Sequence, residues 1–185
     1  LAAYGLTRFR FKRSEDLSFW ILSIRMTPPV AAAIPIFIIM RNLGLLDTPL
    51  ALILAYCTFN VPFATWLLRS FFQEIPQEIE ESAMVDGCSY FGAFFRIAIP
   101  LVAPGLAATG IFTFIFSWNE FLFALILTGT QAQTVPVALT GFIRETGIMW
   151  SHMAAAGVLA MVPMIIFTAL VQRNLVKGLT MGAIR

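Results

Sequence analysis

Four long stretches with few charged residues constrain what this chain can fold into more than any other feature of its sequence. They cover residues 17–40, the interval between Asp47 and Arg69, residues from 100 to beyond 118, and residues 150–171, with Arg25 near one end of the first. A helix needs about 20 predominantly apolar residues to cross the roughly 30 Å hydrocarbon core of a bilayer. Each stretch is long enough, so the sequence predicts four full membrane-spanning helices.

The composition argues against an ordinary soluble domain. Of the 185 residues, 59% are hydrophobic and 12% are charged, whereas soluble domains average about 45–50% apolar and about 25% charged residues. A soluble domain of 185 residues could not form a core large enough to bury such long uncharged runs. The net charge of +2 is small and the basic residues are dispersed, which indicates no surface for nucleic acid. We expect an all-α membrane protein, a polytopic helical bundle in which residues 1–185 form a single transmembrane domain.

The distribution of lysine and arginine predicts which connections face the cytoplasm, because the cytoplasmic side retains positive charge. The opposite loops hold only Arg41 and Arg144. Apart from Arg25, which lies within the first stretch, the remaining basic residues precede the first span, flank the second connection or follow the last span: Arg8, Arg10, Lys12, Arg13, Arg69, Arg96, Arg173, Lys177 and Arg185. Four crossings therefore place the beginning of the chain, the loop of residues 74–96 and the C-terminal end in the cytoplasm.

Prolines interrupt the stretches at Pro28, Pro29, Pro35, Pro62 and Pro163. Each removes a backbone donor and favours a kink. Kinked helices are tolerated in membrane bundles as part of their shape, and they would also let a central cavity open alternately to each side. The sequence does not decide between these two roles.

The connection of residues 74–100 is predicted to form two short helices outside the membrane. Pro76 suits the first turn of a helix, and glutamates crowd the N-terminal end, where the helix dipole favours negative charge. Gly87 suits a left-handed stop, and Ser89 can cap a second helix. The sequence thus predicts a helical hairpin that turns at Gly87.

Both helices of this hairpin carry apolar surface that needs a partner. Ile75, Ile79 and Ala83 repeat every four residues on the first. Aromatic residues load the second: Tyr90, Phe91, Phe94 and Phe95. A helix that lies flat on lipid usually shows lysine and arginine on its polar face, whereas glutamate dominates here. A groove on another protein therefore fits better than a lipid surface.

The spacing of this loop resembles the EAA signature of ABC importer permeases: Glu-Ala-Ala, three residues, Gly, nine residues, and Ile-x-Leu-Pro. Here Glu81, Ser82 and Ala83 are followed by three residues, Gly87, nine residues and then the sequence Ile-Ala-Ile-Pro that ends at Pro100. Ser82 replaces the first alanine and isoleucine replaces the leucine, both conservative changes. The spacing is intact throughout.

This resemblance implies the fold of a type I ABC importer permease, in which residues 74–100 form a cytoplasmic coupling helix seated in a cleft of an ATPase subunit. Glu81 and Asp86 would meet polar or basic groups of the ATPase, with Ser82 and Ala83 beside them. Gly87 would permit the turn, and the rings of Tyr90, Phe91 and Phe94 would fill the cleft.

Metal ligation is not expected, since the single histidine, His152, has no cysteine or carboxylate cluster nearby.

Other segments resemble permeases of binding-protein-dependent carbohydrate importers, in particular the second permease of maltose-type or multiple-sugar importers. These segments are residues 1–12, 28–35, 43–48, 117–121 and 178–182. The resemblance implies a sugar substrate, a second permease as heterodimer partner, two cytoplasmic ATPases, an extracytoplasmic solute-binding protein and the plasma (inner) membrane of a prokaryote. It also implies a chain that lacks its first helix and most of its second.

The chain itself is expected to be non-catalytic and to bind no cofactor, because it contains no Gly-x-x-x-x-Gly-Lys-Ser/Thr phosphate loop. ATP and magnesium would bind in the partner ATPases. Permeases for glycerol-phosphate, polyols, amino acids or peptides share the loop and stay open as alternatives. A secondary transporter would not need the loop, and a membrane-embedded enzyme would need a convergent set of catalytic groups that the sequence does not supply.

Three polar side chains within the spans are candidates for the translocation pathway: Asn60, Asn119 and Glu120. Asn60 falls near the middle of the second stretch, where a buried amide can also join two helices. Asn119 and Glu120 fall about 20 residues after Pro100, roughly 30 Å along a helix. That places them near the outer surface, where a polar group can simply be interfacial.

The loop of residues 129–149 is long for a connection and is predicted to be external. Loops of more than about 12–15 residues are uncommon without a function. The resemblance implies contact with a docked solute-binding protein, and a simple connector is the alternative.

Overall fold

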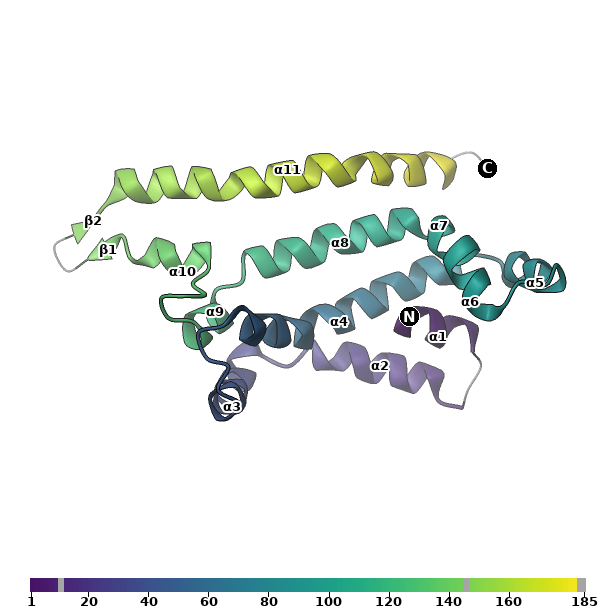
Figure 1. Ribbon diagram of the computed structural model, residues 1–185, viewed down its shortest axis with the longest axis horizontal. Helices are drawn as coiled ribbons and strands as arrows, with labels where there is room; N and C mark the ends of the chain where they lie inside the picture. Colours follow the sequence, from purple (N-terminus) through teal and green to yellow (C-terminus); the bar gives the residue numbers. More distant parts are fainter. Residues whose placement is uncertain (10–11, 145–146, 183–185) are drawn as a thin grey trace.

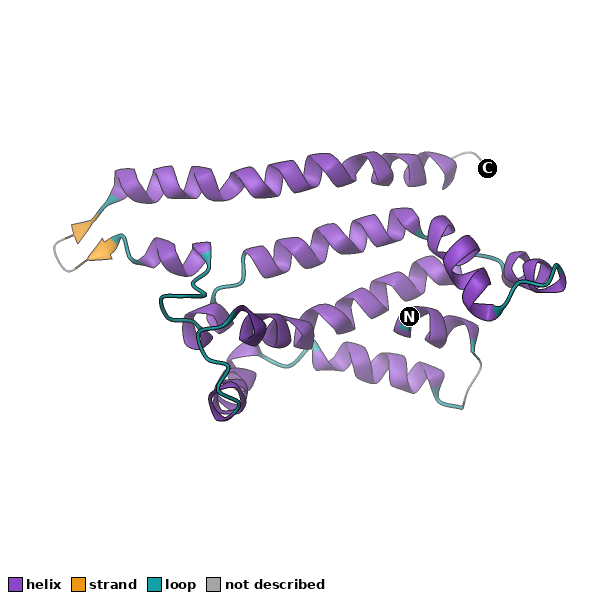
Figure 2. Cartoon of the chain, viewed as in Figure 1, coloured by secondary structure: helices purple, strands orange, loops and turns teal. Residues whose placement is uncertain are grey.

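The computed structural model describes residues 1–9, 12–144 and 147–182, with side chains described as far as Val171, and it is built mainly of helices (Figures 1 and 2). The elements in chain order are α1 (Ala2–Arg8), α2 (Ser14–Ile24), α3 (Pro29–Asn42), α4 (Pro49–Gln73), α5 (Gln77–Val85), α6 (Tyr90–Ala93), the π-helical turn η1 (Phe94–Ala98), α7 (Ile99–Leu101), α8 (Ala103–Trp118), α9 (Leu122–Leu127), α10 (Val135–Thr140), β1 (Ile143–Arg144), β2 (Gly147–Ile148) and α11 (Trp150–Gly182). Arg10, Glu145 and Arg185 lie outside the described residues.

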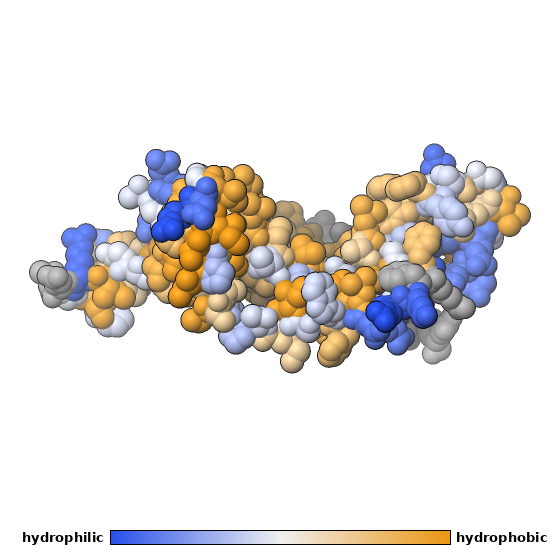
Figure 3. Space-filling model, turned by 90° about the horizontal axis from the view of Figure 1, so that it is seen from below, coloured by the Kyte–Doolittle hydropathy of each residue, from blue (hydrophilic) through white to orange (hydrophobic). Residues whose placement is uncertain are grey.

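The helices α2, α4, α8 and α11 run along the length of the molecule and separate two groups of short elements (Figure 1). One end carries α1, α5, α6 and the last turns of α11. The other end carries α3, α9, α10 and the antiparallel pair β1–β2, in which Ile143 faces Ile148. Hydrophobic side chains cover much of the face between the ends, and hydrophilic ones gather toward both ends (Figure 3).

Two of the four predicted spans are single helices long and apolar enough to cross a membrane, α4 and the segment Trp150–Val171 of α11. The start of α4 follows from its sequence. The Thr48 hydroxyl accepts a hydrogen bond from the Ala51 N–H (3.3 Å), and Pro49 occupies the first turn, where no intrahelical donor is needed. Pro62 lies inside the helix.

The other two stretches do not form single helices of that length, so the predicted count of four full membrane-spanning helices is not confirmed. Helices α2 and α3 meet at 86°, and the Tyr90–Leu101 segment meets α8 at 73°. In the first case Pro28 and Pro29 come four and five residues after the end of α2, and a residue before proline is disfavoured in the helical conformation. In the second, Pro104 lies in the first turn of α8. The described residues hold two such spans, or up to four if each bent pair is one span.

Two buried clusters hold the short elements at the two ends. The first joins α3, α4, α9 and α10 through the residues Ala33, Met40, Ala51, Leu52, Ala55, Phe123, Ala124, Leu127 and Val137. The second joins α1 to the end of α4 and to the segment from η1 to the start of α8, through Ala3, Tyr4, Phe72, Phe94, Ala98 and Val102. The second cluster positions the loop of residues 74–100.

Between these clusters the long helices meet through small and aromatic residues. Gly105 of α8 lies so close to Phe71 of α4 that an added Cβ would approach its ring to 2.4 Å. The guanidinium of Arg25, directly after α2, lies 4.5 Å from the ring centroids of both Phe63 and Phe116. Cation–π contacts of this kind provide partners for a charge inside an apolar bundle.

Candidate functional site

The loop of residues 74–100, called the EAA loop below, projects from one end of the molecule and turns where the sequence predicts. Gly87 has φ 90°. Its N–H donates to the Met84 carbonyl and the Cys88 N–H donates to the Ala83 carbonyl, each at 3.0 Å, which is the Schellman pattern of a helix end. Ser89 then caps α6 by accepting a hydrogen bond from the Gly92 N–H (3.1 Å). Gly87 thus has the left-handed conformation that the sequence predicts, and Pro76 lies directly before α5 rather than inside it.

Most residues assigned to this site by resemblance lie on the outer surface of the loop. Glu81, Ser82, Asp86 and Gly87 are exposed and Ala83 is half-buried. Large hydrophobic side chains stand beside them, with exposed fractions of 88% for Val85, 72% for Phe91, and 62% for both Tyr90 and Phe95. The loop thus presents carboxylates and aromatic rings together.

Phe94 differs from its predicted place among these exposed rings. Its side chain is 5% exposed, and its ring centroid lies 4.7 Å from that of Tyr4 in an edge-to-face arrangement. The reason is that α1 covers this side of the loop, so the ring supports the loop from within.

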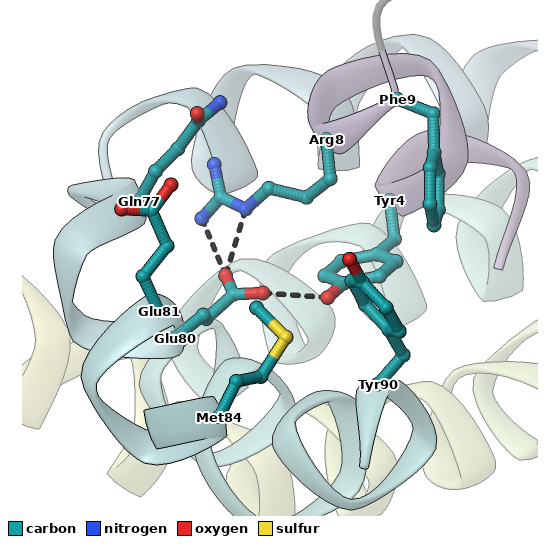
Figure 4. Close-up of a pocket in the computed structure, with 8 residues that line it drawn as sticks. All are labelled: Tyr4, Arg8, Phe9, Gln77, Glu80, Glu81, Met84 and Tyr90. Carbon is teal, nitrogen blue, oxygen red and sulfur yellow. Dashed lines mark hydrogen bonds and ion pairs between the residues drawn. The ribbon is translucent and has the colours of Figure 1, made fainter. Parts of the chain in front are cut away.

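Glu80 is the residue of this site that sequence reasoning missed. Its side chain is buried, and its carboxylate is held by two residues of α1 (Figure 4). The Tyr4 hydroxyl donates to Oε2 (2.5 Å), and the Arg8 Nε donates to Oε1 (2.7 Å). Arg8 Nη2 also lies 2.6 Å from Oε1, and both side chains of this ion pair are less than one-tenth exposed. We call Tyr4, Arg8 and Glu80 the buried cluster.

The sequence offered only a weak signal for this arrangement. The spacing of Ile75, Ile79 and Ala83 predicts that α5 buries that face, yet Ile79 is 42% exposed and the adjacent Glu80 turns inward. Tyr4 and Arg8 are four residues apart on α1 and therefore share a face. Their partner lies 72 to 76 residues away along the chain, and nothing local in the sequence indicates that separation.

The environment of the buried cluster fixes the state of its groups. Burial, reinforced by the hydrogen bond to the Glu80 carboxylate, raises the pKa of Tyr4 to about 12, so the hydroxyl stays protonated and remains a donor at neutral pH. A second donor of Arg8, Nη2, reaches the Ile75 carbonyl at 3.1 Å. The cluster borders a pocket of about 160 Å³. That pocket is lined by Tyr4, Arg8, Phe9, Gln77, Glu80, Glu81, Met84 and Tyr90 (Figure 4).

The three candidates for the translocation pathway all make contacts within the chain. Asn60 donates from Nδ2 to the Ser117 hydroxyl (2.7 Å) and so joins α4 to α8. Asn119 is exposed and donates to the Ile115 carbonyl (2.9 Å). The Glu120 carboxylate accepts from the N–H groups of Phe123 and Ala124 (2.9 and 3.0 Å) and caps α9. These contacts fit the structural roles left open by the sequence, and a pathway role stays a prediction.

At the opposite end, Asp47 fixes the beginning of the predicted external loop, residues 129–149. Its carboxylate accepts hydrogen bonds from four consecutive backbone N–H groups, those of residues 129–132, at 2.7 to 3.2 Å. These backbone donors, with Ala132 and Gly129 the strongest, hold the pKa of Asp47 below its ordinary value of 3.8. The loop is not structureless, because it contains α10 and the strands β1 and β2.

The sequence places the chain among known transport proteins. Residues 1–181 match the family described as binding-protein-dependent transport system inner membrane component. The chain belongs to this family. The resemblance to ABC importer permeases, which rested on the EAA signature and its flanking segments, is thereby confirmed.

Members of this family with curated descriptions match along the whole chain. A probable ABC transporter permease protein of Sinorhizobium fredii is 44% identical over 184 residues, which cover 100% of this chain and 66% of that protein. The trehalose transport system permease protein of Mycobacterium tuberculosis is 40% identical over 188 residues, covering 100% of this chain and 69% of that protein. The chain therefore spans about two-thirds of the length of these relatives.

A solved structure shares the fold. A chain from the crystal structure of a bacterial ABC transporter involved in the import of the acidic polysaccharide alginate superimposes with a TM-score of 0.70 at 15% sequence identity. The match covers 92% of this chain and 70% of that one. At this identity the likeness establishes the helical permease fold.

Proposed function

We propose that the chain is a membrane subunit of an ATP-driven sugar importer, forming half of a translocation pathway with a second permease and coupled through the EAA loop to two cytoplasmic ATPases. The observation that carries this proposal is the exposed surface of the EAA loop, where Glu81 and Asp86 stand beside Phe91 and Tyr90, on a chain that belongs to the permease family. ATP and magnesium bind in the ATPase subunits. This chain contributes no catalytic group.

The chemistry of this surface fits a protein groove. Burying one large aromatic side chain contributes about 1.5–3 kcal/mol, and exposed aromatic residues that cluster on a protruding element are typical anchors of protein interfaces. The carboxylates of Glu81 and Asp86 would meet basic groups around the groove. Phe94 would act from inside the loop by holding η1 against α1.

The orientation proposed for the subunit places this loop in the cytoplasm of a prokaryotic cell, with the chain crossing the plasma membrane several times. The excess of arginine and lysine on the connections at that side supports it. In addition, α1, α5 and the last turns of α11 lie at the same end of the molecule (Figure 1), as an even number of crossings requires. The four crossings then comprise the bent pair α2–α3, α4, α8 and α11.

The substrate class rests on the relatives. One of them is a trehalose permease protein and another a trehalose/maltose permease protein of Thermococcus litoralis. We therefore propose a carbohydrate, delivered by an extracytoplasmic solute-binding protein that contacts residues 129–149. The clamp of Asp47 on residues 129–132 supports this role, since it fixes the base of that loop. A glycerol-phosphate, polyol, amino acid or peptide substrate is the alternative.

Purification of the chain from membranes together with its partners tests the proposal. We expect ATPase and permease partners to remain bound, and a binding protein loaded with its sugar to stimulate ATP hydrolysis; a panel of disaccharides, polyols and amino acids would identify the substrate class. Substrate uptake that is driven by an ion gradient, with no ATPase in the complex, would support a secondary transporter and contradict the proposal.

Two substitutions separate coupling from insertion. Glu81→Lys reverses a charge on the docking surface, by which we mean the exposed Glu81, Asp86, Tyr90 and Phe91 of the EAA loop. Gly87→Pro removes the left-handed turn. Both variants should therefore insert into the membrane and fail to transport. Normal sugar uptake by both would exclude the EAA loop from coupling.

A further inference from the structure

The buried cluster joins two elements that the chain itself does not connect directly. Glu80 lies on α5, whereas Tyr4 and Arg8 lie on α1, 76 and 72 residues earlier. A buried carboxylate is stable only while it is paired and hydrogen-bonded. Because Arg8 and Tyr4 together provide three donors to Glu80, α5 cannot move away from α1 without leaving a charge buried and unpaired.

The EAA loop would be loosely attached without this cluster. It leaves α4 through residues 74–76, which are not helical, and it reaches α8 through a π-helical turn and a bend of 73°. Neither connection is a straight, continuous α-helix, so a displacement of α5 could be absorbed there rather than passed to the long helices.

Helix α1 contacts both of these connections. Arg8 Nη2 donates to the Ile75 carbonyl (3.1 Å) on the side of α4. The Tyr4 ring lies 5.4 Å from the Phe72 ring, at the end of α4, and 4.7 Å from the Phe94 ring, at the start of η1. Helix α1 thus contacts the EAA loop near both of its ends, at Ile75 and Phe94, as well as at Glu80.

We propose that the buried cluster makes α1 and α5 move as one rigid unit, so that a displacement of the EAA loop is passed directly to α1. This inference rests on the proposed function, because it assumes that an ATPase displaces α5. Tyr4, Arg8 and Glu80 are positioning residues in this mechanism. They lie behind the docking surface.

An ion pair is a better choice than an apolar contact for this purpose. Apolar surfaces slide over one another with little change in energy, whereas charged hydrogen bonds depend on distance and direction. Replacing a buried ion pair by hydrophobic residues is often neutral or favourable for stability. The stability of the fold alone therefore does not explain a charged residue at position 80. Resistance of α5 to displacement from α1 does explain it.

Distance measurements on the working complex test the rigid unit directly. Spin labels at Ala2→Cys on α1 and Glu78→Cys on α5, both exposed positions, would be placed in a background carrying Cys57→Ala and Cys88→Ala. A second pair of labels, at Glu78→Cys and Gln133→Cys, measures the distance between α5 and the opposite end of the molecule and so reports whether the complex changes conformation. We expect the α1–α5 distance to stay constant between the nucleotide-free and ATP-trapped complexes while the second distance changes. An α1–α5 distance that shifts as much as the second one overturns the proposal.

Substitutions add a functional measurement. Glu80→Gln removes the charge but keeps the shape, and Glu78→Gln is the matched control, since it makes the same change at an exposed position of the same helix. We expect Glu80→Gln to hydrolyse ATP while the sugar transported per ATP falls by about tenfold, because hydrogen bonds to charged groups contribute enough for a factor of that order. Tyr4→Phe should lie between this variant and the wild type, and the control should match the wild type.

Two outcomes contradict the proposal: an unchanged transport-to-hydrolysis ratio in Glu80→Gln, or a loss of transport and hydrolysis in equal proportion, which indicates a purely structural role. If Glu80→Gln does not assemble, Tyr4→Phe and the spin-label distances decide. Failure of the proposed function would look different, because the wild-type complex itself would not transport sugar on ATP.

Discussion

Gly87 shows how a single backbone conformation can set the position of the whole EAA loop. Its φ of 90° is one that residues with a Cβ rarely adopt, while a Cβ added there would meet nothing within 4 Å. The cost of substitution is therefore backbone strain, about 1–2 kcal/mol for most residues and less for asparagine, which tolerates left-handed conformations.

We expect ATP-driven uptake to fall in the order glycine, asparagine, alanine, valine at position 87, with the amount of protein in the membrane unchanged. Uptake assays normalised to membrane content would measure this series. Equal uptake by Gly87→Val and the wild type would show that the turn does not position the loop.

Asp47 makes a prediction about pH. Its pKa is lowered in the folded protein by four backbone donors, so its contribution to loop stability is fully present above about pH 4 and is lost as the pH falls through the lowered pKa. Asp47→Asn keeps an acceptor but loses the charge, and charge-assisted hydrogen bonds are roughly twice as strong as neutral ones.

Hydrogen exchange of residues 129–132, corrected for intrinsic rates, would test this prediction. At pH 7 the amides should exchange faster in Asp47→Asn than in the wild type, and the difference should disappear as the wild-type carboxylate is protonated. Equal protection of both proteins at pH 7 would contradict the role of the charge.

At the scale of the elements, the contact between α4 and α8 depends on Gly105. A Cβ at this position would lie 2.4 Å from the Phe71 ring, whereas a Cβ at Gly110 on the same helix would meet nothing within 4 Å. We expect Gly105→Ala to destabilise the protein by about 1–3 kcal/mol, as overpacking typically does, and Gly110→Ala to cause no loss.

Thermal unfolding of the detergent-solubilised protein would measure both variants. Adding Phe71→Leu to Gly105→Ala should recover part of the loss, because the smaller side chain makes room for the new methyl group. A Gly105→Ala protein as stable as Gly110→Ala would mean that the two helices can separate without cost.

The elements also show what sequence reasoning can reach. The turn at Gly87 and the cap at Ser89 depend on neighbours within a few residues, so the sequence predicts them. Pro28 and Pro29 reveal that a helix is interrupted, but the 86° angle between α2 and α3 is set by packing against other elements. The sequence therefore predicts four uninterrupted stretches where the structure has two continuous helices and two bent pairs.

At the scale of the whole molecule, the interactions that sequence reasoning missed connect distant parts of the chain. The inward turn of Glu80 depends on α1 lying over the EAA loop, and the clamp by Asp47 joins residues 82 to 85 positions apart. In both cases the hydrogen-bond donors to the carboxylate come from a distant part of the chain, and only folding brings them together. The class of protein could be predicted, since hydrophobic length, charge bias and the EAA spacing are all properties of short segments.

The central claim, that the EAA loop docks on an ATPase, is tested most directly by photo-crosslinking in membranes. A benzoylphenylalanine at Phe91, which is 72% exposed on the loop, would be compared with one at Phe112, which is 46% exposed on α8. The account predicts a crosslinked product that contains the ATPase subunit from position 91 and none from position 112. An intact complex that gives no ATPase crosslink from position 91, or gives it equally from both positions, would contradict it.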